Sequence, residues 1–203
     1  NDAGAIAALR SGEIDSMMHI ISPEQIDSLK SQGLDVLQAP EFSSTLLVYD
    51  TEREPFSDVA VRQAIGLAVD VDRLVEDVYL GAAVSGNAGW VHPDSSWFNP
   101  EISTTTDTEE AKRILEEAGY TFDENEQLLD EEGEKVEAEL LVYGDGALRL
   151  RIAELVAENL EEIGMDIEVE ALEMQSVDDL EWPEFDVTEG RDYDMPIWGW
   201  SAP

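Results

Sequence analysis

The stretch "YGDGALR", residues 143–149, places two glycines and an arginine between an apolar strand pattern and an apolar helix pattern. Backbone N–H groups in such a turn, together with the positive end of a helix, can hold an anion. A dinucleotide-binding fingerprint has a third glycine where this chain has Arg149, and bulky residues follow. We therefore interpret the turn as a flexible helix start, with Arg149 able to contact a ligand carboxylate. An α/β enzyme domain that binds a dinucleotide through the GDG turn at 144–146 is the alternative.

Large aromatic side chains form a second group of candidates. An irregular stretch, residues 82–106, is long enough to expect a functional loop rather than a plain connection. Such side chains can fill a core, but their clustering in one loop and at one strand end favours the wall of a binding cleft. The aromatics in question are Trp90, Trp97 and Phe98 in the loop, and Trp198 and Trp200 on either side of Gly199.

Other potential sites are weaker. The acidic stretch 123–134 suggests a calcium loop, but Leu128 stands where an EF-hand needs glycine, so a solvated hairpin tip is expected. His19 lies in an apolar run and is expected to be a strand residue, whereas His92 lies in the irregular loop, where a surface position is expected. No nucleophile elbow, zinc-protease motif or Walker phosphate loop occurs. We therefore expect no catalytic residue, no cofactor and no metal.

The charge balance limits the partners. Against 48 acidic residues the chain has 11 basic ones, a net charge of −37, which excludes a nucleic-acid-binding protein. The acids are spread along the chain and lysine is scarce. At about 1 M salt the screening length is only roughly 3 Å, so adaptation to molar salt is the favoured explanation. An acidic surface for cations or basic partners, such as a calcium-dependent interaction module, is the alternative.

Cysteine usage and hydropathy exclude further classes. The chain has no cysteine, so disulfides, thiolate metal sites and thiol nucleophiles are excluded. No apolar run approaches the roughly 20 residues of a membrane span. Because the sequence starts and stops inside patterned segments, we expect a piece of a longer protein.

The periodicity predicts an α/β fold. Apolar alternation at 136–142 and 165–171, on either side of a helix pattern at 148–163 that Gly164 ends, indicates a βαβ unit. A hairpin with its turn at Asp130–Gly133 is expected just before this unit. Further helices are expected at 2–10, 22–33 and 107–118, and further strands at 13–21, 34–40, 43–50 and near the end of the chain.

The segment "PFSDVAVRQAIGLAVDVDRLVEDVYLG", residues 55–81, predicts two consecutive helices. Asp58 and Asp70 stand where each helix needs an N-cap. Arg62 and Arg73 are spaced to pair with Asp58 and Asp77, respectively. We expect both arginines to be structural.

The order of four motifs resembles the family 5 extracellular solute-binding proteins, which are receptors of ABC importers for peptides, nickel and related solutes. The motifs are "ALRSGEID", residues 55–81, "EEAKRILEEAGY" and "YDMPIWGW". This resemblance implies a periplasmic-binding-protein-like fold of the large two-lobed class, with a mixed sheet and flanking helices. It assigns residues 1–40 to a hinge-side helix and strands, and residues 41–203 to most of the second lobe, incomplete at its C-terminus.

The resemblance also implies a function and a site. It implies capture of a solute, expected to be an oligopeptide, by a monomer that is extracellular, anchored as a lipoprotein and served by ABC permease subunits. In peptide-binding members an aspartate three residues after the Gly-Trp tryptophan holds the free amino group. Trp200 matches that tryptophan, but Pro203 occupies the aspartate's position, so this mode of amino-group recognition is in doubt. The expected ligand-binding residues are Trp90, Tyr143, Arg149, Trp198 and Trp200.

Overall fold

The structure, a computed structural model, describes residues 2–18, 23–37, 43–87, 91–102, 105–144, 146–186 and 191–201. Its contacts divide the chain into two units, residues 1–40 and 41–203, and each is described by itself. In the part of the chain that is described, no helix is both long and apolar enough to cross a membrane.

The first unit contains two short helices, α1 (Asp2–Ser11) and α2 (Pro23–Ser31), as the sequence predicts. The strands expected at 13–21 and 34–40 are wrong over their described parts, since residues 13–18 and 34–37 form no strand. A strand needs a hydrogen-bonded neighbour, and the described residues of this unit provide none. The remaining residues of both segments lie outside the described ranges.

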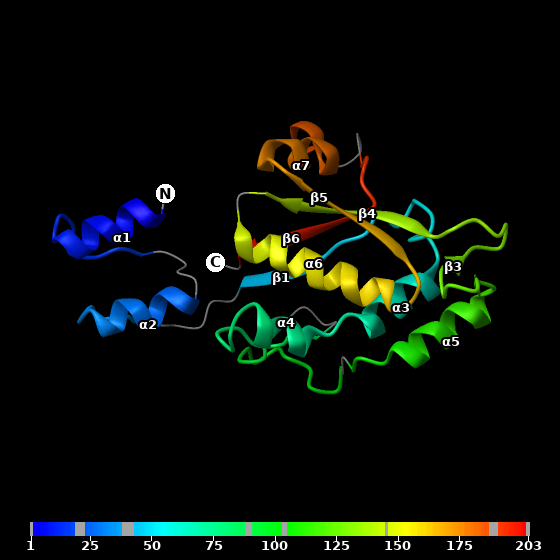
Figure 1. The fold of residues 1–203 in the computed structure, drawn as a ribbon, viewed down its shortest axis with the longest axis horizontal. Coiled ribbons are helices and arrows are strands. Elements are labelled where there is room, and N and C mark those ends of the chain that lie inside the picture. Colours follow the sequence, from blue (N-terminus) through cyan, green and yellow to red (C-terminus); the bar gives the residue numbers. More distant parts are fainter. Residues whose placement is uncertain are drawn as a thin grey trace. The chain divides into compact units, whose positions relative to one another are not determined.

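The second unit is built on a four-stranded mixed sheet in the order β1-β6-β4-β5. Strand β1 (Ser43–Leu47) is antiparallel to β6 (Met195–Ser201), and β6 is parallel to β4 (Glu137–Tyr143). Strand β5 (Asp166–Leu172) is parallel to β4, and α6 (Ala147–Glu161) connects the two (Figure 1). The predicted βαβ unit and the α/β class are confirmed.

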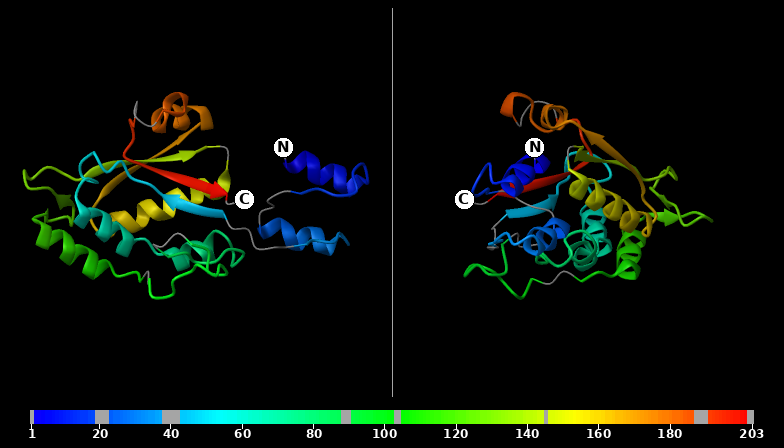
Figure 2. Two further views of the ribbon diagram at one scale, coloured as in Figure 1. Left: turned by 180° about the vertical axis from the view of Figure 1, so that it is seen from behind. Right: turned by 60° about the vertical axis from the view of Figure 1, so that its left-hand side comes forward.

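Helices cover both faces of this sheet, and the burial pattern of β4 reflects it. Helix α6 packs against one face, while α7 (Met174–Glu181) lies over the other (Figure 2). The last four residues of β4, from Leu140 to Tyr143, are buried whichever face they point to. The core on the α6 side is continuous with α3 (Val59–Ala68) and α5 (Thr108–Ala118).

The paired helices predicted in residues 55–81 are confirmed as α3 and α4 (Val71–Asp77). Both predicted caps form, because Asp58 Oδ1 accepts from the Ala60 N–H at 2.8 Å and Asp70 Oδ1 accepts from the Arg73 N–H at 2.9 Å. The start of α4 is also tied to α6, where the buried Asn159 Oδ1 accepts from the Asp70 N–H at 3.1 Å.

The two arginines of this segment are structural, but one partner differs from the prediction. Arg73 lies 3.4 Å from Asp77, as expected, and 3.6 Å from Glu158 on α6. Arg62 instead donates to the carbonyl oxygens of Phe56 and Ser57, the latter at 3.0 Å. The Asp58 carboxylate is already occupied in capping α3, which explains the change.

Two short strands, β2 (Thr121–Phe122) and β3 (Leu128–Leu129), form a hairpin beside the βαβ unit. The chain then turns back at the predicted position, where the Gly133 N–H donates to the Asp130 carbonyl at 3.1 Å. Gly164 ends α6 with φ of 83°, and a Cβ there would lie 2.5 Å from the Glu126 carbonyl oxygen. Only glycine therefore fits between α6 and the hairpin.

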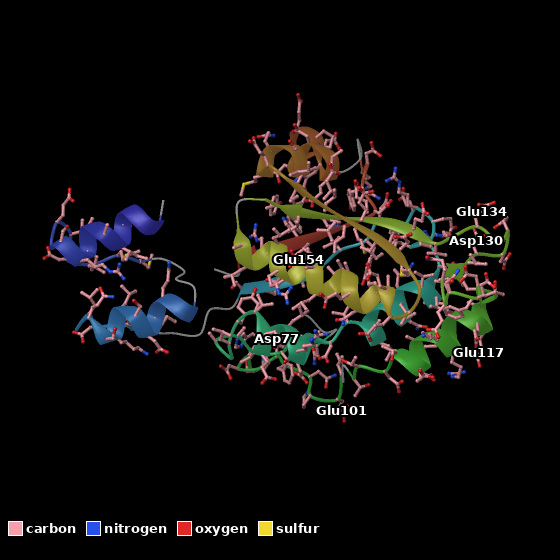
Figure 3. The ribbon with its side chains drawn as sticks, viewed as in Figure 1. Asp77, Glu101, Glu117, Asp130, Glu134 and Glu154 are labelled. Carbon is pink, nitrogen blue, oxygen red and sulfur yellow. The ribbon has the colours of Figure 1, made fainter. Side chains whose placement is uncertain are left out.

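Acidic side chains project from many elements of the second unit (Figure 3). Those labelled in the figure come from α4, the 82–106 loop, α5, the hairpin turn and α6. They are Asp77, Glu101, Glu117, Asp130, Glu134 and Glu154.

Candidate functional site

Three of the five predicted ligand-binding residues lie together where β4 and β6 approach their carboxyl ends. Tyr143 is the last residue of β4, Arg149 lies in the first turn of α6, and Trp198 lies on β6. Trp90 lies outside the described residues. Trp200 pairs with Ser44 through the backbone, and its side chain is not described.

The Arg149 guanidinium has a defined position in this group. Its Cζ lies 4.8 Å from the centroid of the Tyr143 ring, a cation–π distance. A Cβ added to Gly199 would lie 3.2 Å from Arg149 Nη2, so the glycine lets the guanidinium lie close to β6. Of the described carboxylates, none lies within the 4.0 Å of an ion pair with Arg149. Its charge-assisted donors are therefore not used by an acid of the described chain.

Tyr143 is held from the other side of the sheet. Its hydroxyl donates to Asp178 Oδ1 on α7 at 3.2 Å. Burial raises the pKa of Tyr143 above its ordinary value, and the negative charges of Glu181 and Asp178 raise it further. The phenol therefore stays neutral, and its ring is a fixed platform beneath Arg149.

A pocket of about 180 Å³ adjoins Trp198 on the α7 face of the sheet. The Trp182 and Trp198 rings meet edge to face there, with centroids 4.3 Å apart. Glu181 is only 8% exposed, and its Oε1 has no hydrogen-bond partner within the described structure. Burial raises the pKa of Glu181 to about 7, with a smaller contribution from Asp178. The pocket is lined by Val48, Glu181, Trp182, Arg191, Tyr193, Pro196 and Trp198.

Sequence reasoning missed Glu181, Trp182 and Tyr193. A glutamate next to a tryptophan at the end of a short helix was the available signal, in "DDLEWP". It carries no information on its own, because only the packing of α7 against the sheet brings these side chains to Trp198. That packing is a long-range contact which local patterns do not encode.

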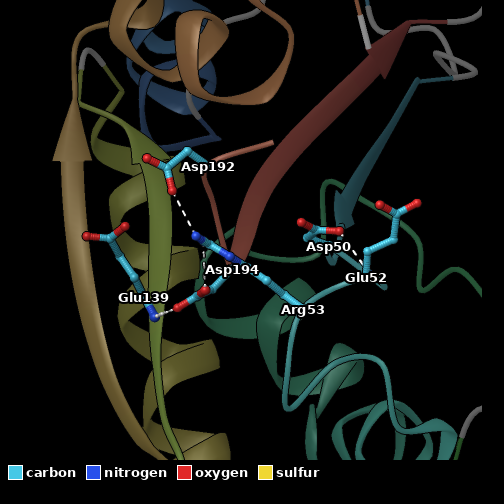
Figure 4. A network of polar contacts seen from close by, with 6 residues as sticks. All are labelled: Asp50, Glu52, Arg53, Glu139, Asp192 and Asp194. Carbon is cyan, nitrogen blue, oxygen red and sulfur yellow. Dashed lines mark hydrogen bonds and ion pairs between the residues drawn. The ribbon is translucent and has the colours of Figure 1, made fainter. Parts of the chain in front are cut away.

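At the amino ends of β4 and β6 the polar groups form a closed network (Figure 4). Arg53 Nη2 lies 2.8 Å from Asp192 Oδ1, and Arg53 Nη1 lies 3.3 Å from Asp194 Oδ1. The second oxygen of Asp194 accepts from the Glu139 N–H at 2.9 Å. Asp50 Oδ1 accepts from the Glu52 N–H at 3.0 Å, and the Asp50 N–H donates to the Asp194 carbonyl. The network connects β1, β4 and β6, and it is structural.

The remaining predicted features have structural explanations. Asp123 and Asp130 in the acidic stretch cap their own turns by accepting backbone N–H groups, such as those of Gln127 and Glu134. His92 accepts from the Asp94 N–H at 3.1 Å within a turn of the loop. Within the described ranges, no cluster of three or more metal-ligating side chains occurs. His19 and Pro203 lie outside those ranges.

The GDG turn does not offer its backbone as a dinucleotide site would. The Gly144 N–H donates to the Leu172 carbonyl at 2.8 Å, which closes the turn against β5. Gly146 is the N-cap of α6, and Asp145 lies outside the described residues. The dinucleotide alternative is therefore not supported by the geometry of Gly144.

Comparison with known proteins gives a consistent result. The profile of the family described as "Bacterial extracellular solute-binding proteins, family 5 Middle" matches residues 1–203. The oligopeptide-binding protein AppA of Bacillus subtilis is 26% identical over 204 residues, covering 97% of this chain and 36% of that protein. The dipeptide-binding protein of Escherichia coli is 34% identical over 101 residues, covering 48% of this chain and 18% of that protein.

Solved structures show the same fold. NikZ of Campylobacter jejuni, in complex with Ni(L-His), superposes with a TM-score of 0.80 at 23% identity, covering 99% of this chain and 38% of that one. AppA of Bacillus subtilis, in complex with a nonapeptide, has a TM-score of 0.80 at 24% identity, covering 98% of this chain and 39% of that one. The chain thus spans little more than a third of the length of these relatives.

Proposed function

Because the chain belongs to the bacterial extracellular solute-binding proteins of family 5, we propose that it supplies part of a receptor for an ABC importer. The receptor captures a small peptide or a related solute by closure of two lobes and passes it to the permease. It binds its solute without chemical change. Residues 41–203 would form most of one lobe, and residues 1–40 would lie on the hinge side.

The observation that carries this proposal is the position of Arg149. Its guanidinium lies over the Tyr143 ring and beside Gly199, with no acid of the described chain as an ion-pair partner. A planar guanidinium recognises a carboxylate through two parallel hydrogen bonds. Trp198 and Tyr143 supply the adjoining aromatic surface, which is typical of sites for small solutes. These three side chains would bind the carboxylate end of a peptide.

The setting follows from the same family and from the charge. We infer an extracellular, lipoprotein-anchored monomer that works in concentrated salt. The extracellular location of proteins in this family supports this inference. The net charge of −37 and the spread of acidic side chains over many elements in Figure 3 support a salt-adapted surface.

Mass spectrometry of small molecules released from the purified full-length protein tests the proposal. We expect peptides to be recovered in stoichiometric amounts after mild denaturation. The Arg149→Ala variant, prepared in parallel, should carry less peptide, and the Arg151→Ala variant is its matched control. Arg151 lies on the same helix, is exposed and pairs with Glu154 at 3.0 Å. Repeated recovery of no peptide from the unaltered protein would reject the peptide assignment.

A further inference from the structure

Glu181 is a buried acidic residue, and the described chain supplies no hydrogen-bond partner for one of its carboxylate oxygens. Its side chain is at the end of α7, the residue is 8% exposed, and Oε1 has no hydrogen-bond partner within the described residues. Leaving a buried acceptor unpaired is unfavourable, and more so when the group is charged. Glu181 also lines the 180 Å³ pocket, so this carboxylate lies next to space that a ligand can enter.

The walls of this pocket suit a cation. Trp182 and Trp198 meet edge to face at 4.3 Å, and Tyr193 supplies a third aromatic ring. Aromatic faces attract ammonium and guanidinium groups within about 6 Å, most strongly where water is excluded. The volume is well above what one water molecule needs, so a cationic head and part of an alkyl stem fit.

Charges around the pocket favour the same occupant. Asp178, on the same helix as Glu181, adds negative charge. Arg191 is the basic residue of the lining, but its Nη1 lies 3.2 Å from Glu52 Oε1. Val48, just after β1, and Pro196 and Trp198 on β6 complete the lining, and none of the three titrates. No basic group of the described chain lies within ion-pair distance of Glu181, so a cation beside it would come from a ligand.

We propose that the pocket formed by Glu181, Trp182, Tyr193 and Trp198 binds an alkylammonium or alkylguanidinium group. Cation binding in this pocket does not rest on the proposed receptor function, but one of the two possible sources of the cation does. That source is the side chain of a lysine or arginine in a captured peptide, since Trp198 belongs to both this pocket and the Arg149 site. The other source is a free organic amine.

Binding is expected to release a proton near neutral pH. The pKa of Glu181 is about 7 in the empty pocket, whereas a bound cation stabilises the carboxylate and lowers that pKa. The titratable groups that face it are Asp178 on α7, Tyr143 on β4 and, from the segment before β6, Tyr193 and Arg191. Affinity for the cation therefore rises between pH 6 and pH 8.

Calorimetric titration of the full-length protein at constant salt tests the site. The probes are butylguanidinium and its neutral analogue butylurea, followed by the peptides Ala-Arg-Ala and Ala-citrulline-Ala. We expect Ala-Arg-Ala to bind at least tenfold more tightly than Ala-citrulline-Ala. If a free cation is sufficient, butylguanidinium should also bind at least tenfold more tightly than butylurea. Butylguanidinium binding identifies a free cation as sufficient, and a preference confined to the peptides identifies a side chain of the solute.

Two matched variants decide whether Glu181 is responsible. Glu181→Gln keeps the shape and removes the charge, so it should abolish the preference and leave binding of the neutral probe unchanged. Glu173→Gln makes the same change at an exposed position at the start of α7 and should have no effect. Glu181→Gln should also leave the melting temperature of the empty protein unchanged or higher, which verifies folding.

The inference is overturned if neither guanidinium probe binds, if the neutral probes bind equally well, or if Glu181→Gln keeps the preference. Peptide binding without a guanidinium preference would reject the pocket and leave the proposed receptor function intact. Butylguanidinium binding in a protein that binds no peptide would support the pocket and reject the proposed peptide receptor.

Discussion

Two acidic side chains near the same sheet, Asp194 and Glu181, differ in how their carboxylate oxygens are paired. Asp194, just before β6, uses both oxygens, one on Arg53 and one on the Glu139 N–H (Figure 4). Glu181, over the α7 face near Trp198, is more deeply buried and leaves Oε1 without a partner in the described chain. The first carboxylate joins strands, and the second belongs to a residue that lines a pocket.

The same contrast holds for the arginines. Arg53 and Arg73 each lie within ion-pair distance of two carboxylates, and Arg62 donates to two loop carbonyls. Arg149 contacts an aromatic ring and a strand backbone, without a described acid nearby. Arg149 therefore differs from Arg53 and Arg73 in having no carboxylate of the described chain within ion-pair distance, and from Arg62 in donating to no loop carbonyl that would fix it. Pairing therefore separates the structural groups from the candidate binding groups more clearly than charge alone.

The pH dependence of stability should separate Glu181 from the paired acids most strongly. The pKa of Glu181 is raised from an ordinary 4.5 to about 7, so its contribution is full below about 4.5 and is lost as the pH rises through 7. The shift corresponds to at most about 3 kcal/mol. As the pH rises from 4.5 to 8, the free energy of unfolding should therefore decrease less in the Glu181→Gln variant than in the unaltered protein. Urea denaturation at constant salt measures this difference.

Glu139 titrates in the same range, so it provides the control. A hydrogen bond shared with Glu170, followed by burial, raises the pKa of Glu139 to about 7. In the Glu139→Gln variant the free energy of unfolding should therefore still decrease with pH to the extent that Glu181 causes. Identical pH profiles for Glu181→Gln and the unaltered protein would show that Glu181 is not desolvated as described.

Removing the paired carboxylate should give the next largest effect. Asp194→Ala leaves the Glu139 N–H without its acceptor and separates Arg53 from the start of β6. We expect a loss of about 2 kcal/mol of unfolding free energy. Asp192→Ala removes the more exposed partner of Arg53 and should lose less than about 1 kcal/mol. Equal losses in urea denaturation would show that the network does not depend on Asp194.

The smallest predicted effect concerns the approach of Arg149 to β6. Gly199→Ala would place a Cβ about 3.2 Å from Arg149 Nη2, and the flexible guanidinium would move by a few tenths of an ångström. We expect peptide affinity to fall by about threefold, which corresponds to roughly 0.7 kcal/mol. Gly66→Ala on α3 meets no atom within 4 Å and should leave affinity unchanged. An affinity loss of the same size in both variants would contradict this account of Gly199.

Local signals in the sequence predicted local structure well. Asp58 and Asp70 could be predicted as caps because a cap depends only on residues two or three positions away. The βαβ unit followed from periodicity at 136–142, 148–163 and 165–171. Prediction failed where a long-range partner decides the outcome. Residues 13–18 have an apolar strand pattern but no described neighbour to pair with.

The candidate site divides in the same way. The turn after β4 and the strand-end tryptophans were visible in the sequence, so Tyr143, Arg149 and Trp198 could be named as candidates. Glu181 could not, because its position depends on how α7 packs over β4 and β6. A glutamate in a chain with 48 acidic residues gives no signal until its burial is known.

The most direct test of the central claim is the affinity of the full-length protein for a peptide and for its C-terminal amide, with and without Arg149. We predict that the unaltered protein binds the free-carboxylate peptide about tenfold more tightly, a difference of about 1.4 kcal/mol. Arg149→Ala should remove that difference, whereas Arg151→Ala should retain it. Equal affinity for both peptides in the unaltered protein, or a preference that survives Arg149→Ala, would contradict the assignment of Arg149 as the carboxylate-binding residue.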